Sequence, residues 1–202
     1  MMILRNAPAS PYGRKIRISA ALLGLENELK IEPADTNDAS DTLRQQNPLG
    51  KIPVLIIEDG TALYDSRVAV EYLDHRAGGG KIIPSAPNAR FAALRMQALC
   101  DGIADAALLR IYEKRWRSPE HYEQKWLDHQ SGKMTRALAS LEANSPALSG
   151  TPHIGQIALA CALGYLDLRF EGYWRADHPR LVAWLDSFAN AVPAFAATRA
   201  TP

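Results

Sequence analysis

Short apolar runs alternate with amphipathic segments over the first 76 residues of the chain. The runs predict strands, because each is only a few residues long and ends at polar or turn residues. The amphipathic segments predict helices, because their apolar residues recur every three or four positions. The resulting order is βαβαββα, with strands expected at 2–4, 28–31, 54–57 and 62–64 and a weak polar helix at 38–46. This pattern predicts a small α/β unit.

Capping residues mark where the stronger helices of this unit begin and end. Ser10 is a good N-cap, and Pro11 at the first helical position loses no N–H that the helix needs. Gly24 supplies the C-terminal stop. Asp65-Ser66 begins another helix, after a hairpin turn built on Asp59-Gly60. The inward face of that helix is predicted to be Val68, Ala69, Tyr72 and Leu73.

The rest of the chain is helical in pattern. Three consecutive glycines and two prolines interrupt the pattern at 78–87, where we expect a linker between a first domain, 1–77, and a second, 88–202. Helices are expected at 88–116, 119–143, 154–169 and 178–189, followed by a short turn. The predicted architecture is therefore an α/β domain followed by an all-α domain.

Composition narrows the possible partners. The apolar content of 47% and charged content of 22% are typical of a soluble globular protein. A formal charge of +1 provides no field for nucleic acid or an anionic membrane. The N-terminus has no basic segment followed by an apolar one, so we expect a cytoplasmic protein rather than a secreted one. Cys100 and Cys161 lie in apolar helical patterns, which favours buried reduced thiols.

Several kinds of cofactor and catalytic motif are missing from the sequence. There is no metal-spaced His/Cys cluster, no glycine-rich phosphate loop and no Gly-x-Ser-x-Gly elbow. We therefore expect no bound metal, and most kinds of hydrolase activity are disfavoured.

Four segments, in this order and at this spacing, resemble the soluble glutathione S-transferase family. They are 9–15 (ASPYGRK), 47–55 (NPLGKIPVL), 64–73 (YDSRVAVEYL) and 101–105 (DGIAD). The resemblance implies a thioredoxin-like N-terminal domain, an all-α C-terminal domain, glutathione as co-substrate and a homodimer. Ser10 at the catalytic position resembles the serine-type branch, here of bacterial type.

Two segments are candidates for holding glutathione. The resemblance implies a cis Ile52-Pro53 bond, which would leave the N–H and C=O of Ile52 free to bind the cysteinyl part of glutathione like an added strand. The alternative is a trans proline that starts a strand. Asp65 and Ser66 lie at a helix N-terminus, which suits the γ-glutamyl carboxylate, and Asp65 would pair with the ammonium group. The alternative is a plain cap, and many relatives carry a longer Glu or Gln at the position of Asp65.

Ser10 is the candidate catalytic residue. Its hydroxyl would donate a hydrogen bond to the sulfur of glutathione and favour the reactive thiolate. The alternative is an N-cap without chemistry. Lys51 and Arg14 are candidates to offset the glycyl carboxylate or the thiolate charge, with Lys51 preferred. Arg14 and Lys15 also fit a solvated helix face, which is the expectation for Lys15.

The resemblance implies a looser apolar pocket for the electrophile, between the first helix and the first long helix of the second domain. Candidates are Tyr12 and the stripe Ala104, Leu108, Ile111, Tyr112 and Arg115. A stripe at this spacing is more often core than ligand pocket. Asp101 would approach the γ-glutamyl end from the partner subunit, as acidic residues there do in some relatives.

One departure from the family concerns residues 153–156. The family usually has a Ser/Thr-x-x-Asp capping box here, whereas this chain has His153 and Gln156. His153 would cap only through a ring nitrogen, and otherwise Thr151 would take over the cap.

These observations predict a glutathione transferase that activates the glutathione thiol for attack on a small electrophile. A glutathione-dependent peroxidase or disulfide reductase on the same site is the first alternative. A non-catalytic binding or regulatory protein that has kept the fold is the second.

Overall fold

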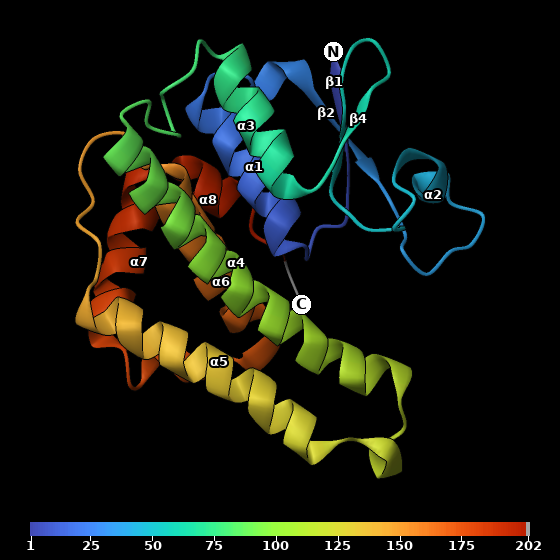
Figure 1. Cartoon of the computed structure of the whole chain (residues 1–202), viewed down its shortest axis with the longest axis vertical. Helices are drawn as coiled ribbons and strands as arrows, with labels where there is room; N and C mark the ends of the chain where they lie inside the picture. Colours follow the sequence, from blue (N-terminus) through green and yellow to red (C-terminus); the bar gives the residue numbers. More distant parts are fainter. Residues whose placement is uncertain (201–202) are drawn as a thin grey trace.

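The computed structural model describes residues 1–200 of the chain (Figure 1). Its single sheet has the strand order β2-β1-β3-β4. β1 runs parallel to β2 and antiparallel to β3, and β4 is antiparallel to β3. The strands are β1 (Met2–Asn6), β2 (Leu29–Pro33), β3 (Val54–Ile56) and β4 (Ala62–Leu63). The predicted order βαβαββα is confirmed.

Three helices belong to the sheet. α1 (Pro11–Leu22) and α3 (Ser66–Arg76) pack against each other, whereas the short α2 (Leu43–Gln46) lies on the opposite side of the sheet (Figure 1). α2 occupies only the end of the predicted 38–46 helix. The polar residues before it form turns in which Asp38 and Asp41 accept backbone N–H bonds. These side chains compete with helical hydrogen bonds, which explains the late start.

The second half of the chain is helical, as predicted. The central α6 packs against both α4 and α1 and is buried over most of its length. α4 and α5 form a long antiparallel pair beside it (Figure 1). The helices are α4 (Pro87–Trp116), α5 (Gln124–Ala143), α6 (Ile154–Phe170), α7 (Pro179–Ala191) and α8 (Pro193–Ala197), with short 3-10 turns η1 (Glu26–Glu28), η2 (Pro119–His121) and η3 (Tyr173–Arg175).

The inward face of α3 differs from the prediction at one position. Val68 is 46% exposed, and Val70 is fully buried in its place. The helix buries residues 66, 69, 70, 73 and 74, a stripe that excludes Val68. Asp74 belongs to this stripe because its carboxylate accepts the N–H groups of Gly80, Lys81 and Ile82. Asp74 thereby fixes the start of the glycine-rich segment 78–87.

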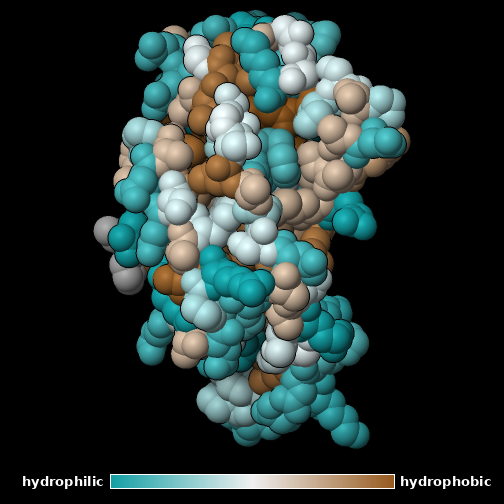
Figure 2. All heavy atoms as spheres, turned by 90° about the vertical axis from the view of Figure 1, so that its left-hand side faces the viewer, coloured by the Kyte–Doolittle hydropathy of each residue, from teal (hydrophilic) through white to brown (hydrophobic). Residues whose placement is uncertain are grey.

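Apolar residues are scattered among polar ones on the face that Figure 2 displays. Within residues 1–200, no helix is long and apolar enough to cross a membrane. Cys100 and Cys161 are both free and buried, as predicted.

A buried ion pair joins α1 to α4. Lys15 Nζ lies 2.7 and 2.8 Å from the two carboxylate oxygens of Asp101. The two side chains are only 1% and 6% exposed. The expectation that Lys15 lies on a solvated face is therefore wrong. The reason is that α1 packs against α3, α6 and α8, which buries most of its residues, including Lys15.

We predict that Lys15→Ala lowers the free energy of unfolding by about 3 kcal/mol, because it leaves the buried Asp101 carboxylate with Arg67 as its one remaining cation. Denaturant unfolding measures this loss. Lys30→Ala is the matched control, since it breaks an exposed pair with Glu32, 58% and 34% exposed, and is expected to change nothing measurable. Equal losses in the two variants would contradict a special role for the buried pair.

His153 caps α6. Its Nδ1 accepts the N–H of Gly155 at 3.1 Å, and the side-chain oxygen of Gln156 accepts the N–H of His153 at 2.9 Å. Gln156 also donates to the C=O of Ala147. The capping box is therefore present with a histidine and a glutamine, and Thr151 does not replace it. Because Nδ1 is an acceptor, this cap requires neutral imidazole.

This cap predicts a pH dependence of stability. Burial lowers the pKa of His153 below its ordinary value of 6.5. Between these two pKa values the unfolded chain binds a proton that the native chain does not, so stability falls as the pH drops below about 6.5. We expect His153→Asn, which caps without titrating, to flatten the pH dependence of the unfolding free energy between pH 7 and 5. Parallel curves for the two proteins would contradict this role.

Candidate functional site

Ser10 lies between the end of β1 and the first turn of α1. Its Oγ accepts the N–H of Gly13 at 3.1 Å, so it is the N-cap that the sequence predicts. A hydroxyl that accepts through a lone pair still has its proton to donate. Gly13 is required here, because a Cβ at this position would lie 1.8 Å from the side-chain oxygen of Asn6. Capping and thiol activation are therefore compatible roles for Ser10.

The turn before β3 presents the backbone of Ile52. The Ile52-Pro53 bond is cis. Asn47, only 2% exposed, holds the turn, with its amide donating to the C=O of Lys51 and its side-chain oxygen accepting the N–H of Leu49. Of the backbone hydrogen bonds that residues 1–200 form outside helices and strands, none involves Ile52. Its N–H and C=O thus fit the predicted peptide-binding edge.

Asp65 and Ser66 begin α3. Asp65 Oδ1 accepts the N–H of Arg67 at 2.9 Å, which makes Asp65 the N-cap. Its second carboxylate oxygen is left for another partner. Ser66 is the first helical residue and is almost completely buried. Asp65 is therefore a helix cap, and glutathione binding at this helix N-terminus stays a prediction.

The sequence analysis did not predict a role for Arg67 at this site. Its Nε donates to Asp101 at 3.2 Å, and its guanidinium is half exposed beside the start of α3. Asp101 therefore binds two cations of its own chain, Lys15 and Arg67, and its approach to the partner subunit's site stays a prediction. The residues around Arg67 could not predict this contact, because Asp101 lies 34 residues further along the chain.

Arg14 points away from the predicted site. Its guanidinium donates to the C=O of Phe195 and to the hydroxyl of Thr198, and it stacks 3.9 Å above the Phe195 ring. Gly164 makes room for it, since a Cβ there would lie 2.5 Å from Arg14 Nη1. Arg14 therefore holds α8 against α1. Of the two candidates for the glycyl carboxylate, Lys51 remains, exposed beside the Ile52 turn.

Tyr12 connects α1 to α4, the helix that carries the predicted electrophile-binding residues. Its hydroxyl donates to Asp105, and burial together with the Asp105 carboxylate raises the pKa of Tyr12. Leu108 and Tyr112 are half-buried further along α4. Ala104 is 3% exposed and belongs to the core.

The pairing of the two helices has a simple geometry. Lys15 meets Asp101 and Tyr12 meets Asp105, so the helices run past each other in opposite directions. α1 begins at Pro11, and the α4 stripe beyond Asp105 therefore continues past the end of α1 (Figure 1). Ser10 precedes Pro11 and therefore lies toward this later part of α4, which we call the wall.

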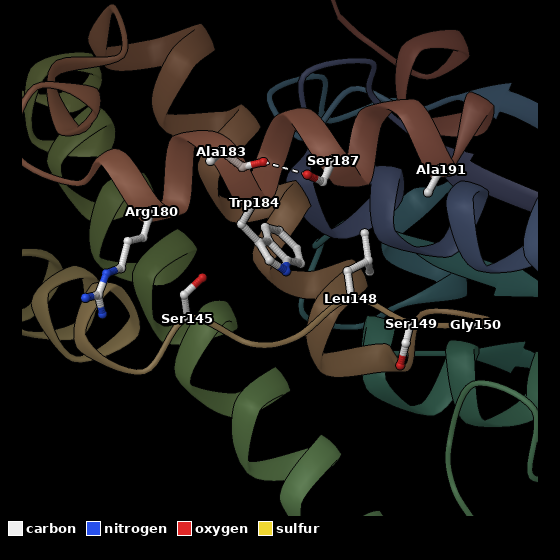
Figure 3. Close-up of a pocket in the computed structure, with 9 residues that line it drawn as sticks. All are labelled: Ser145, Leu148, Ser149, Gly150, Arg180, Ala183, Trp184, Ser187 and Ala191. Atoms are coloured by element: carbon white, nitrogen blue, oxygen red, sulfur yellow. Dashed lines mark hydrogen bonds between the residues drawn. The ribbon is translucent and has the colours of Figure 1, made fainter.

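Two hollows lie away from these residues. One, of about 560 Å³, lies between α7 and the loop after α5 and includes Arg180 and Trp184 in its lining (Figure 3). The other, of about 650 Å³, lies between α4 and α5 and reaches His153. Neither contains a residue of the predicted glutathione site. Among residues 1–200, no group of three or more His, Cys, Asp or Glu side chains could hold a metal ion.

Known proteins match the whole chain. The family model described as "Glutathione S-transferase, N-terminal domain" matches residues 9–76, and the C-terminal domain model matches 124–187. The uncharacterised GST-like protein YibF of Escherichia coli K12 is 32% identical over 95% of this chain and 98% of its own. The chain belongs to the glutathione S-transferase family. Its fold is accordingly the predicted one, a thioredoxin-like unit followed by a helical one.

Solved structures of family members agree with this assignment. A glutathione transferase family member from Pseudomonas fluorescens Pf-5, crystallised with bound glutathione, has a TM-score of 0.90 and 41% identity, with both chains covered completely. A second structure of that relative contains S-(propanoic acid)-glutathione, at 40% identity and a TM-score of 0.85, again with complete coverage of both chains. A glutathione S-transferase from Methylobacillus flagellatus KT with glutathione bound matches at 34% identity, a TM-score of 0.90 and complete coverage.

Proposed function

We propose that this protein is a serine-type glutathione transferase, which activates the thiol of glutathione for attack on a small electrophile. The observation that supports the proposal is that Ser10 caps the N-terminus of α1 as a hydrogen-bond acceptor, which leaves its hydroxyl proton available to a ligand. The full-length glutathione-bound relatives support glutathione as the co-substrate.

Three elements would hold glutathione in this proposal. The free N–H and C=O of Ile52 bind the cysteinyl part as an added strand beside Pro53. The N-terminus of α3 at Ser66 receives the γ-glutamyl carboxylate, and the free oxygen of Asp65 pairs with the ammonium group. Lys51 offsets the glycyl carboxylate.

Ser10 would act on the sulfur by donating a hydrogen bond to the thiolate. Lowering a thiol pKa by one unit requires about 1.4 kcal/mol. The N-terminus of a helix contributes roughly 0.3–1 kcal/mol toward an anion. The Ser10 hydrogen bond must therefore supply the larger part. In this proposal the hydroxyl is not consumed, since no side-chain base among residues 1–200 forms a hydrogen bond with Ser10.

We also propose that the protein acts as a cytoplasmic homodimer. Large apolar side chains on α3 and α4 are exposed in the single chain: Phe91 at 68%, Val68 at 46% and Leu99 at 38%. Such side chains favour a protein–protein contact. Sedimentation velocity tests this, and a monomer at micromolar concentration would contradict it.

We predict that Ser10→Ala lowers kcat/KM with 1-chloro-2,4-dinitrobenzene by about tenfold or more, because the thiolate loses its hydrogen bond. The glutathione Kd, measured by calorimetry, should change less than about twofold, because Ser10 does not hold the peptide. Ser10→Thr is the matched control, since it keeps both the cap and the hydroxyl, and its rate should stay near that of the wild type.

Three results would contradict the proposal in different ways. Equal rates in Ser10→Ala and the wild type would remove Ser10 from its role. Reduction of peroxides or mixed disulfides without transfer to the chlorinated acceptor would favour the reductase alternative. Failure to bind millimolar glutathione would leave only a non-enzymatic role.

A further inference from the structure

Two exposed arginines, one on α4 and one on α6, pair with no carboxylate of residues 1–200. Arg115 and Arg169 are exposed, and neither forms an ion pair with any of residues 1–200. By contrast, Arg67 is paired with Asp101, and Arg117 is paired with Glu113 on the same helix. Unpaired guanidinium groups beside a reaction site are available to a ligand.

The two arginines come from neighbouring helices that pack against each other. The guanidinium of Arg115 lies 5.4 Å from the ring centre of Tyr112, one turn earlier on α4. Arg169 lies one turn after Tyr165 on α6, the helix that packs most closely against α4. Burial raises the pKa of Tyr165, while Arg169 and Arg115 both act to lower it. The guanidinium of Arg110 on α4 lies 4.8 Å from the ring centre of Phe170, the residue after Arg169, so the last turns of α4 and α6 lie side by side.

The acids near this wall are already matched. Asp105 accepts the hydrogen bond of Tyr12, and Asp101 is bound by Lys15 and Arg67. Beyond Asp105, α4 contributes Leu108, Tyr112 and Arg115, and its Glu113 carboxylate is paired with Arg117. The wall therefore combines apolar and aromatic surface with an excess of positive charge.

Resting on the proposed transferase function, we propose that the acceptor is a small electrophile that carries a carboxylate, which Arg115 and Arg169 bind. Tyr112 and Leu108 would contact its apolar body, leaving the electrophilic carbon toward the sulfur at Ser10. Charge-assisted hydrogen bonds from guanidinium to carboxylate are among the stronger polar contacts, so they would select this acceptor over a neutral one of the same shape.

Two probe acceptors of the same shape test this inference. In 4-chloro-3-nitrobenzoate and 4-chloro-3-nitrobenzamide, the glutathione sulfur forms a C–S bond at the carbon that carries chlorine. The C–Cl bond breaks, chloride leaves with the bonding electron pair, and the thiol proton passes to solvent. Each kcat/KM is divided by the uncatalysed rate constant with glutathione, which removes the difference in intrinsic reactivity.

We expect the corrected kcat/KM of the wild type to favour the benzoate by about tenfold or more, the scale of one charge-assisted hydrogen bond. In Arg115→Gln/Arg169→Gln this preference should fall to near one. Arg136→Gln, at an exposed arginine on α5, is the matched control and should keep the wild-type preference. Circular dichroism and thermal unfolding confirm that each variant is folded.

The outcomes separate this inference from the proposed function. Reaction of both acceptors with no preference for the benzoate, or a preference that survives the double substitution, overturns the inference and leaves the transferase function intact. Reaction of neither acceptor, in protein that binds glutathione, overturns both.

Discussion

The buried pair of Lys15 and Asp101 is the contact on which the arrangement of the site depends. It ties α1, which Ser10 caps, to α4, whose later turns continue past the start of α1. The same carboxylate also binds Arg67 at the start of α3. One acidic group thus connects three helices. Burial removes water from both charges of the pair, and their attraction offsets that cost only when the two groups keep close contact.

From this pair, the contact between α1 and α4 changes character step by step toward Ser10. At Asp101 it is buried and ionic, and one turn further it is the hydrogen bond between Tyr12 and Asp105. Beyond Asp105, α1 has ended and α4 continues with Leu108, Tyr112 and Arg115. The contact between α1 and α4 is therefore fixed at Asp101 and absent beyond Asp105. This arrangement suits an enzyme that always binds glutathione but binds its acceptor through a different set of side chains.

The sequence predicted features that depend on a few adjacent residues. Ser10 with Pro11 and Asp65 with Ser66 mark helix starts through local capping, and the short apolar runs identified every strand of the sheet. Contacts between distant residues were missed or misjudged. Lys15 has the charge of a surface residue, and only the packing of three helices around α1 buries it.

The same limit applies within the candidate site. Arg67 and Asp105 gain their significance from partners 34 and 93 residues away, which no local pattern indicates. The sequence suggested that Arg14 binds an anionic ligand, but its guanidinium donates a hydrogen bond to the C=O of Phe195 in α8. Tyr165 and Arg169 gave no signal, because an apolar run such as α6 is typical of core.

A crystal structure of this protein with glutathione would test the assignment of roles most directly. The predicted result places the sulfur within about 3.5 Å of the Ser10 hydroxyl, with the backbone of Ile52 paired to the cysteinyl part of glutathione. A sulfur that points away from Ser10, or glutathione bound at another part of the surface, would contradict it.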